Sequence, residues 1–236
     1  MQTVILSGGL GTRVRSVFKD IPKAMIPLAG VPFVDHQLSL LRRNGITAVV
    51  MCVGYLGDQI VEYVGDGSRW EMEVTYSFDD PGRLLGTAGA VLRALPLLQD
   101  TFMIMYGDSY LPTDYQAVAG AFRERHARAM MCVYRNCGKW DPSNVRIQDA
   151  QVVYYSKQAV PGEVEYIDYG LTVFRRAVFE GYARHAVPLD LQTILQDQVA
   201  QGVLAAFEVQ DRFYEIGKPE GIAACEDYLL STGVKE

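Results

Sequence analysis

The sequence predicts an α/β fold in which a mostly parallel sheet is flanked by helices and carries a small β-rich insertion. Short apolar runs typical of buried strands alternate with segments of helical periodicity through most of the chain. Residues 144–174 depart from this alternation, because strand-like runs follow one another there with little helical period between them. We find no internal repeat and no linker in the 236 residues, so we expect a single domain that spans residues 1–236.

The N-terminal part of the chain begins with an apolar run at residues 3–6, which predicts a buried strand, and a glycine-rich loop at residues 7–12 follows it. Residues 33–44 carry apolar side chains at helical spacing and end before Gly45, a residue type that commonly terminates helices. The next elements continue the alternation. We expect strands at residues 46–53 and 72–78 and helices at residues 58–64 and 87–95, the last of them closed by Pro96.

Residues 102–106 predict another short buried strand, which ends directly before Gly107 and Asp108. Open α/β sheets bind ligands at the carboxyl ends of their strands, so Asp108 is a candidate functional residue. The β-rich insertion then supplies expected strands at residues 152–155 and 166–174. The expected order closes with helices at residues 189–201 and 220–230 and a strand at residues 203–209 between them.

Composition and charge exclude several classes of protein. Charged residues make up 21% and hydrophobic residues 49% of the chain, which is the balance of a folded globular protein and not of a disordered one. The formal net charge is −6, and no cluster of Lys or Arg is dense enough to follow a nucleic-acid backbone, so we expect no nucleic-acid partner. No apolar run approaches the ~20 residues of a membrane span, so we expect no membrane partner.

The cysteines favour a cytoplasmic location. The four of them form no C-x-x-C pair, and Cys52 and Cys132 lie in apolar runs that predict buried strands. The N-terminus also lacks the basic and apolar regions of a secretory signal. We therefore expect a protein of the reducing cytoplasm. Nothing in the sequence fixes the oligomeric state, and assembly into a homo-oligomer stays open.

The loop after the first strand has the composition of a phosphate-binding loop. Residues 6–13 read LSGGLGTR, so three glycines leave backbone N–H groups accessible to an anion and Arg13 adds a fixed positive charge. Two common nucleotide motifs are excluded, because Val14 stands where the dinucleotide fingerprint needs its third glycine and no Gly-Lys-Ser/Thr follows Gly8 at P-loop spacing. A tight turn between strand and helix without a ligand is the simpler alternative.

A second element begins soon after the glycine loop. Residues 22–28 read PKAMIPL, and the prolines on both sides of Lys23 stiffen the loop, which lowers the entropy lost when a cation is held on a ligand. Together the two elements resemble the signature of the sugar-1-phosphate nucleotidyltransferases, the NDP-sugar pyrophosphorylases. The resemblance covers most of the chain. Within the family, the chain most resembles the short, single-domain heptose and mannose 1-phosphate guanylyltransferases. It implies the Rossmann-like nucleotide-diphospho-sugar transferase fold.

The resemblance implies a nucleotide site at the glycine loop. In the family this loop and its arginine hold the triphosphate, the Pro-Lys lysine positions the reacting phosphates, and a Leu-Gly-Thr-Ala element, matched here by residues 85–88, lies against the base. A helix start capped by Thr87 is the alternative for that element. The catalytic residues implied by the resemblance are Arg13, Lys23, Asp108 and Lys157. The implied nucleotide-binding residues are Leu6, Ser7, Gly8, Gly9, Gly11, Thr12, Arg13, Gly86 and Thr87.

The resemblance also implies Mg²⁺ as the cofactor. Asp108 matches the family's Gly-Asp aspartate, a magnesium ligand, although an aspartate at a strand end can also be a turn residue. Magnesium takes one or two carboxylates together with phosphate oxygens. The family's second acid lies in a stretch matched by residues 213–220, which read FYEIGKPE. Glu215 stands there where aspartate is usual, so direct ligation and ligation through water both stay open.

Residues of the β-rich insertion resemble the family's sugar-phosphate site. Lys157 matches the lysine of a Glu-Lys pair that binds the sugar phosphate, but Ser156 replaces the glutamate. Residues 167–171 resemble an Asn-x-Gly element that contacts sugar hydroxyls, with Asp168 in place of asparagine. A carboxylate accepts hydrogen bonds and cannot donate them, so this residue would suit hydroxyl donors, although an exposed acid at a strand end is nearly as good an interpretation. The implied sugar-phosphate-binding residues are Lys157, Asp168 and Gly170.

The reaction implied by the resemblance joins a nucleoside triphosphate and a sugar 1-phosphate. An anomeric phosphate oxygen attacks the α-phosphorus, pyrophosphate leaves, and an NDP-sugar forms without a covalent enzyme intermediate. We favour GTP with a heptose or mannose 1-phosphate. Two alternatives stay open. One is a nucleotidyltransferase that uses CTP and an alcohol phosphate, which the departures at Ser156 and Asp168 favour. The other is a catalytically silent regulatory subunit that binds nucleotide-sugars, which the change at Glu215 keeps open, whereas the presence of Arg13, Lys23 and Asp108 favours an enzyme.

Overall fold

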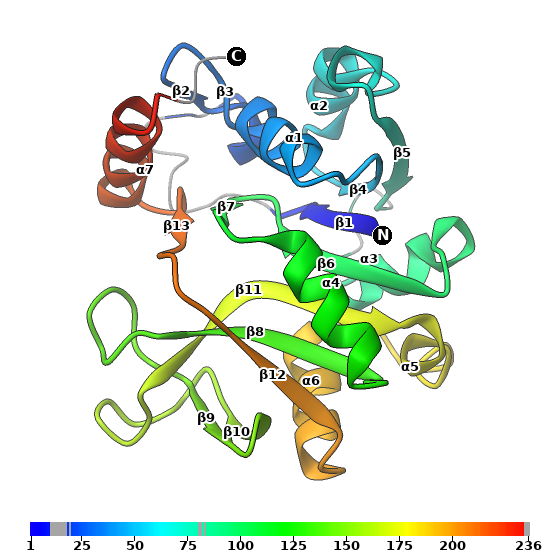
Figure 1. Ribbon diagram of the computed structural model, residues 1–236. Helices are drawn as coiled ribbons and strands as arrows, with labels where there is room; N and C mark the ends of the chain where they lie inside the picture. Colours follow the sequence, from blue (N-terminus) through cyan, green and yellow to red (C-terminus); the bar gives the residue numbers. More distant parts are fainter. Residues whose placement is uncertain (10–17, 19, 80–81, 83, 234–236) are drawn as a thin grey trace.

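The computed structural model describes residues 1–9, 18, 20–79, 82 and 84–233. In these residues nine strands form one large sheet with helices on both faces (Figure 1). The order of the strands across the sheet is β5 (Glu73–Phe78), β4 (Ala48–Val53), β1 (Gln2–Ser7), β6 (Thr101–Tyr106), β11 (Tyr166–Arg175), β8 (Ala129–Arg135), β12 (Leu204–Val209), β10 (Gln151–Tyr155) and β9 (Val145–Gln148). The predicted α/β fold class is thereby confirmed.

The sheet has two parallel parts that an antiparallel strand joins. Strands β5, β4, β1 and β6 pair in parallel, and so do β8 and β12. Strand β11 runs antiparallel to both β6 and β8, and β10 and β9 extend one edge by antiparallel pairing. The strands of the expected β-rich insertion therefore belong to the main sheet. The register of β11 against β8 shifts between Asp168 and Thr172, at the level of the predicted sugar-phosphate residues.

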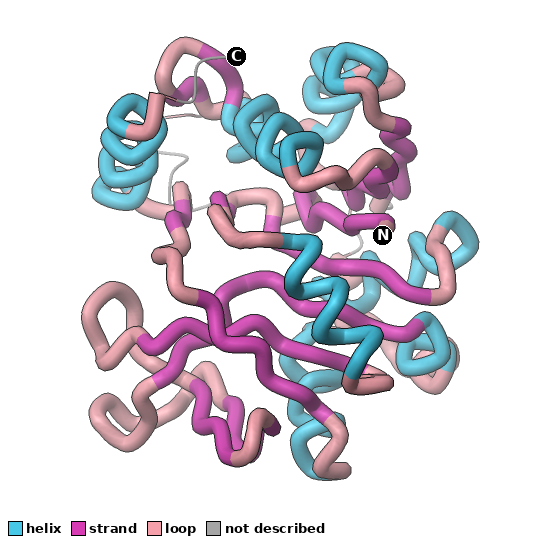
Figure 2. The backbone as a smooth tube through the Cα atoms, viewed as in Figure 1, coloured by secondary structure: helices cyan, strands magenta, loops and turns pink. Residues whose placement is uncertain are grey.

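Helices cover both faces of the sheet (Figures 1 and 2), and an apolar layer lies between each face and its helices. Successive residues of a strand point to opposite faces, so Ile5 belongs to one layer and Val4 to the other. Helices α1 (Phe33–Arg43), α2 (Gly57–Val64), α4 (Tyr115–Glu124) and α7 (Pro219–Ser231) pack on the first layer. Helices α3 (Thr87–Ala94), α5 (Arg176–Glu180) and α6 (Leu191–Ala200) pack on the second.

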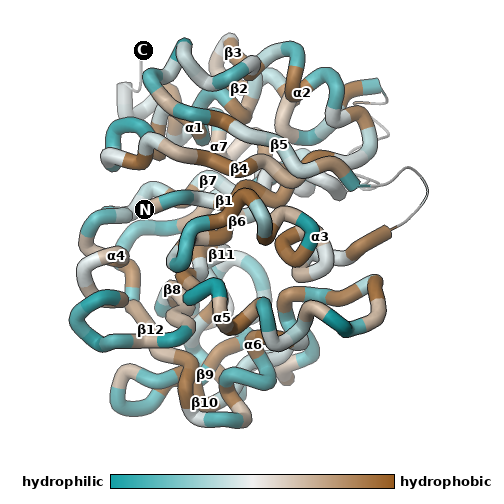
Figure 3. Tube along the Cα trace, turned by 90° about the vertical axis from the view of Figure 1, so that its right-hand side faces the viewer, coloured by the Kyte–Doolittle hydropathy of each residue, from teal (hydrophilic) through white to brown (hydrophobic). Residues whose placement is uncertain are grey.

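The polarity of the chain follows these layers. Figure 3 shows hydrophobic residues concentrated around β1, β4 and β6, with hydrophilic residues along the outer loops. Residues 49–53 of β4 are all buried, as expected for a strand that helices cover on both faces. In the helices of the described residues, no stretch combines the length and the apolar composition that crossing a bilayer requires.

The carboxyl ends of β1 and β6 come together closely. The backbone N–H of Gly107 donates to the carbonyl of Leu6 at 2.9 Å. A Cβ atom on Gly107 would lie 2.3 Å from Ser7 Oγ, so only glycine allows this approach. The two strands therefore deliver the start of the glycine loop and Asp108 to one place.

Helix α4 has a side-chain cap that supports a stability prediction. The carboxylate of Asp114 accepts hydrogen bonds from Gln116 N and Ala117 N, both at 2.9 Å. We expect Asp114→Ala to lower the free energy of unfolding by about 1 kcal/mol, because the first turn of the helix loses its side-chain cap, whereas Asp114→Asn keeps the cap and changes little. Urea denaturation of the two variants tests this. Equal stability of Asp114→Ala and the unaltered chain would contradict it.

Candidate active site

A cavity of about 370 Å³ opens at the carboxyl ends of β1, β4 and β6. This volume lies within the range of small-molecule sites in proteins. Part of the sequence-predicted set lines it, namely Leu6, Ser7, Gly8, Gly9, Lys23, Gly86, Thr87 and Asp108. The other described residues of its wall are Ala24, Cys52, Asp79, Leu84, Leu85, Ala90, Tyr106, Gly107 and Pro188. The predicted residues Gly11, Thr12 and Arg13 lie outside the described residues.

An ion pair lies in the wall of this cavity. Lys23 Nζ is 2.7 Å from Asp108 Oδ2, although the two residues are far apart in the sequence. Lys23 begins a short 3₁₀ turn (Lys23–Met25) after Pro22, and Asp108 lies two residues after the end of β6, so a rigid turn and a strand end hold the two charges. Their side chains keep 19% and 29% of their surface exposed. The ammonium group can therefore reach a ligand in the cavity as well as its carboxylate partner.

Glu215 lies next to Asp108 through a small two-stranded sheet. Strand β13 (Tyr214–Glu215) pairs antiparallel with β7 (Ser109–Tyr110), which places Glu215 opposite Ser109. The backbone N–H of Ile216 donates to the carbonyl of Asp108 at 2.9 Å. A Cβ on Gly217 would lie 3.8 Å from Lys23 Nζ, so the whole turn closes against the ion pair. Glu215 itself lines a second cavity of about 190 Å³ and does not line the first one.

The two acids fit a magnesium ion by the chemistry of their donors. Asp108 and Glu215 offer carboxylate oxygens from neighbouring backbone segments, and magnesium in phosphate-transferring sites takes one or two carboxylates. Within the part of the chain that the structure describes, no group of three or more His, Cys, Asp or Glu side chains gathers to hold an ion. An ion bound to these two acids would therefore complete its coordination with water and substrate phosphate oxygens.

The wall beside Gly86 is built by two segments distant in the sequence. Gly86 adopts a φ of +77°, and a Cβ there would lie 2.4 Å from the carbonyl oxygen of Leu189. That oxygen accepts hydrogen bonds from Ala88 N and Gly89 N at 2.9 and 3.1 Å. The hydroxyl of Thr87 does not cap its own helix but accepts from Leu191 N at 2.7 Å. The start of α3 is thus fixed to the segment that leads into α6.

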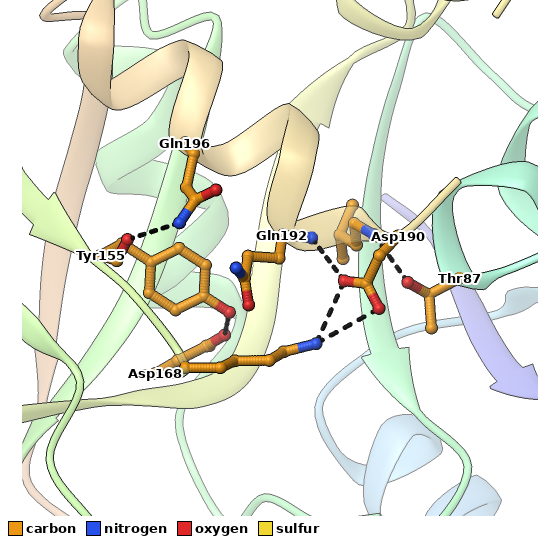
Figure 4. Close-up of polar contacts among 8 residues, drawn as sticks. Thr87, Tyr155, Asp168, Asp190, Gln192 and Gln196 are labelled. Carbon is orange, nitrogen blue, oxygen red and sulfur yellow. Dashed lines mark hydrogen bonds and ion pairs between the residues drawn. The ribbon is translucent and has the colours of Figure 1, made fainter. Parts of the chain in front are cut away.

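The predicted sugar-phosphate residues lie in a separate polar cluster, of which Figure 4 labels Asp168, Tyr155 and Asp190. The phenol of Tyr155 donates to Asp168 Oδ2 at 3.1 Å, and Gly170 N donates to Asp168 Oδ1 at 2.9 Å. Burial raises the pKa of the Asp168 carboxyl, and these hydrogen bonds together with the charge of Lys157 partly offset the rise. Lys157 Nζ lies 3.1 Å from Asp190 Oδ1. The described wall of the first cavity includes none of the residues of this cluster, namely Tyr155, Lys157, Asp168, Gly170 and Asp190.

Tyr106 connects the cluster with the cavity. This residue lines the cavity, and a Cβ on Gly170 would lie 3.5 Å from its ring. Burial raises the pKa of Tyr106 well above its usual value, and four carboxylates add to the effect, namely those of Asp168, Asp190, Asp108 and Glu215. The phenol is therefore neutral at physiological pH. Since the acids of both groups act on one ring, the cavity and the sugar-phosphate cluster are neighbours.

Sequence reasoning missed Asp79, Tyr106, Tyr155 and Asp190 as site residues. Asp79 and Tyr106 lie at the ends of β5 and β6, so the strand-end rule that selected Asp108 could have found both. Asp190 has the signature of an ordinary helix cap before an apolar run, and the sequence carries no signal of its contact with Lys157.

Comparison with known proteins gives one family and several relatives. The model of the family described as nucleotidyl transferase matches residues 2–140. The D-glycero-alpha-D-manno-heptose 1-phosphate guanylyltransferase of Campylobacter jejuni is 28% identical over 220 residues, which cover 93% of this chain and 96% of the relative. The UTP–glucose-1-phosphate uridylyltransferase of Synechocystis is 34% identical over 139 residues, 55% of this chain. The match covers 36% of the length of that second relative.

Solved structures share the fold over nearly the whole chain. HddC from Yersinia pseudotuberculosis, complexed with GMP-PN, superposes with a TM-score of 0.79 at 25% identity, covering 96% of this chain and 99% of that one. The inositol-1-phosphate CTP transferase from T. maritima superposes with a TM-score of 0.78 at 23% identity, covering 98% of this chain and 94% of that one. The second likeness supports the fold alone.

The close contact of Gly86 with the Leu189 carbonyl leads to a prediction about stability. A side chain there requires the left-handed conformation and meets the Leu189 carbonyl, so we expect Gly86→Ala to lower the free energy of unfolding by about 2 kcal/mol or more and to weaken nucleotide binding. Gly120→Ala is the matched control, because Gly120 lies inside α4 with nothing within 4 Å of an added Cβ. We expect that control to be stabilised by roughly 0.5–1 kcal/mol. Urea denaturation of both variants decides, and equal shifts in the same direction would contradict the prediction.

Proposed function

The chain belongs to the nucleotidyl transferase family, and we propose that it transfers a nucleotidyl group from a nucleoside triphosphate to a sugar 1-phosphate. The observation that carries the proposal is the pairing of Lys23 with Asp108 at 2.7 Å in a cavity that the start of the glycine loop also lines. This cavity lies at the carboxyl edge of the parallel strands, where open α/β sheets bind ligands. A cation and backbone N–H groups in one cavity can bind the phosphates of a triphosphate, and an acid beside them can hold the magnesium ion that neutralises these phosphates.

The chemistry needs charge neutralisation and alignment more than it needs a nucleophile from the protein. A sugar phosphate oxygen would form a bond to the α-phosphorus while the bond to the pyrophosphate oxygen breaks, and both reactants are polyanions. Lys23 would donate to phosphate oxygens of the reacting pair, and Lys157 would hold the acceptor phosphate. Arg13, which lies outside the described residues, would offset the charge of the leaving pyrophosphate. Magnesium on Asp108 and Glu215 would add positive charge at the phosphates.

A carboxylate in the cavity wall favours guanine as the base. Asp79 follows β5, where its N–H donates to the carbonyl of Val53 at 2.9 Å. A Cβ on Gly8 would lie 2.9 Å from Asp79 Oδ2, and the charge of Asp79 adds to burial in raising the pKa of the Cys52 thiol to about 12. Guanine presents adjacent N1–H and N2–H donors that match a carboxylate, whereas uracil and thymine present one N–H there. GTP is therefore our proposed donor, in agreement with the name of the C. jejuni guanylyltransferase and with the GMP-PN complex of HddC from Y. pseudotuberculosis.

The proposed acceptor is a heptose or mannose 1-phosphate. The support is the C. jejuni relative, whose match extends through the segments of Lys157, Asp168 and Gly170. The second candidate is a transfer from CTP to an alcohol phosphate. The departures from the family pattern at Ser156 and Asp168 favour that candidate.

A matrix assay tests the function. Each common nucleoside triphosphate is combined with mannose 1-phosphate, heptose 1-phosphate, glucose 1-phosphate and inositol 1-phosphate in the presence of Mg²⁺, and pyrophosphate is measured. We expect release with GTP and one of the first two acceptors. Release only with CTP and inositol 1-phosphate would favour the second candidate, and nucleotide binding without release in any combination would favour a silent regulatory subunit.

Substitution of two acids in the cavity wall, Asp108 and Asp79, is expected to affect different kinetic properties: the first changes the rate, and the second changes the selection of the base. We expect Asp108→Asn to lower the rate by about 10²–10³, because the site loses a carboxylate that would hold Mg²⁺ at the reacting phosphates and that fixes the ammonium group of Lys23. We expect Asp79→Asn to raise the KM for GTP by roughly tenfold and to reduce the preference for GTP over UTP, with little change in kcat at saturating GTP. Steady-state kinetics measure both effects, and Asp114→Asn on α4 is the matched control for loss of a carboxylate. An unchanged GTP preference in Asp79→Asn would remove this residue from base recognition.

A further inference from the structure

Asp190 is the acid with which Lys157 forms an ion pair in the described part of the chain (Figure 4). We propose that Asp190 is a positioning residue: it holds the ammonium group of Lys157 for the acceptor phosphate and ties it to the wall of the nucleotide cavity. The inference rests on the proposed function, because it assigns Lys157 to the acceptor. It adds a residue to that site and a connection between the two substrates.

Asp190 is fixed by the start of a helix. It is the N-cap of α6, and its Oδ1 accepts a hydrogen bond from Gln192 N at 2.8 Å. The same carboxylate lies 3.1 and 3.3 Å from Lys157 Nζ through its two oxygens. Lys157, in contrast, follows β10 in an exposed loop and has a long side chain with about 2 kcal/mol of rotamer entropy. The rigid partner therefore sets the place of the flexible one.

The segment before α6 belongs to the wall of the nucleotide cavity. Pro188 lines the cavity, and Leu189 N donates to the carbonyl of Leu85 at 2.8 Å. Leu191, the residue after Asp190, donates its N–H to the hydroxyl of Thr87 at 2.7 Å. Thr87 and Asp190 are labelled in Figure 4. Asp190 thus lies between backbone groups that are bonded to the predicted base-binding element. Lys157 is located relative to the donor nucleotide through this one carboxylate.

The ion pair is too exposed to be explained by stability. The side chains of Lys157 and Asp190 keep 49% and 50% of their surface exposed, and pairs of this kind contribute about 0–1 kcal/mol. An ammonium group has three N–H donors, so it can bond to a phosphate oxygen while Asp190 still holds it. The ion pair contributes mainly by aligning the ammonium group of Lys157 with the acceptor phosphate, since a misplaced charged group can lower the rate by as much as about 10²-fold.

Removal of the negative charge of Asp190 has two effects on the acceptor KM, and they have opposite signs. The negative charge of Asp190 repels an acceptor phosphate, so its removal would lower the acceptor KM if repulsion dominated. Its removal frees Lys157, so the acceptor KM rises if positioning dominates. Asp190→Asn separates the two effects cleanly, because Asn is as good a helix cap as Asp and keeps the bond to Gln192 N.

The test compares Asp190→Asn with Asp114→Asn, which makes the same change at the cap of α4. With GTP and mannose 1-phosphate as probes, we expect Asp190→Asn to raise the acceptor KM roughly 5- to 20-fold and to lower kcat, with the KM for GTP changed less than about twofold. We expect Asp114→Asn to change none of these. A lower acceptor KM in Asp190→Asn, or equal behaviour of the two variants, would overturn the proposal.

A double-mutant cycle with Lys157→Ala excludes a merely structural role. If Asp190 acts through Lys157, Asp190→Asn has less than about a twofold effect once the lysine is gone. The same 5- to 20-fold loss in both backgrounds would show that Asp190 acts on the fold and would overturn the proposal. Calorimetric binding of mannose 1-phosphate beside a non-reactive GTP analogue repeats the cycle without turnover. Failure of the function itself is distinguishable, because the unaltered chain would then release no pyrophosphate.

Discussion

The close approach of the carboxyl ends of β1 and β6 is the constraint on which the site depends. Gly107 N bonds to the carbonyl of Leu6, and no Cβ fits between the two strands at that point. Because the strands meet there, the start of the glycine loop and Asp108 line one cavity. Lys23 comes from a third segment, and the stiff turn after Pro22 brings it within 2.7 Å of Asp108.

Paired charges characterise this site. Lys23 is bonded to Asp108 and Lys157 to Asp190, so each described lysine of the site has an acid beside it. A protein of net charge −6 can hold polyanionic substrates in this way, since each acid fixes a cation that still has donors left for phosphate. Acids of both groups also raise the pKa of Tyr106, a half-buried residue that lines the cavity and keeps its proton. Local placement of charge, and not its total, makes the cavity suitable for phosphates.

The sequence predicted the parts of the fold and site that depend on local patterns. Apolar runs located β1, β4 and β6, and the rule that ligands bind at strand ends selected Asp108. The helix α4 was not among the expected elements, although Asp114 and the apolar spacing after it are a recognisable start. The contact of Asp190 with Lys157 was beyond reach for a different reason. It joins a helix cap to a loop 33 residues away, and neither partner carries a signal of the other in a single sequence.

The most direct test of the account is the crystal structure of this chain with a non-hydrolysable GTP analogue. We expect phosphate oxygens within hydrogen-bonding distance of Lys23 Nζ and a base that lies along Gly86 with its N–H edge toward Asp79. A nucleotide bound outside this cavity, or bound inside it with its phosphates turned away from Lys23, would contradict the account.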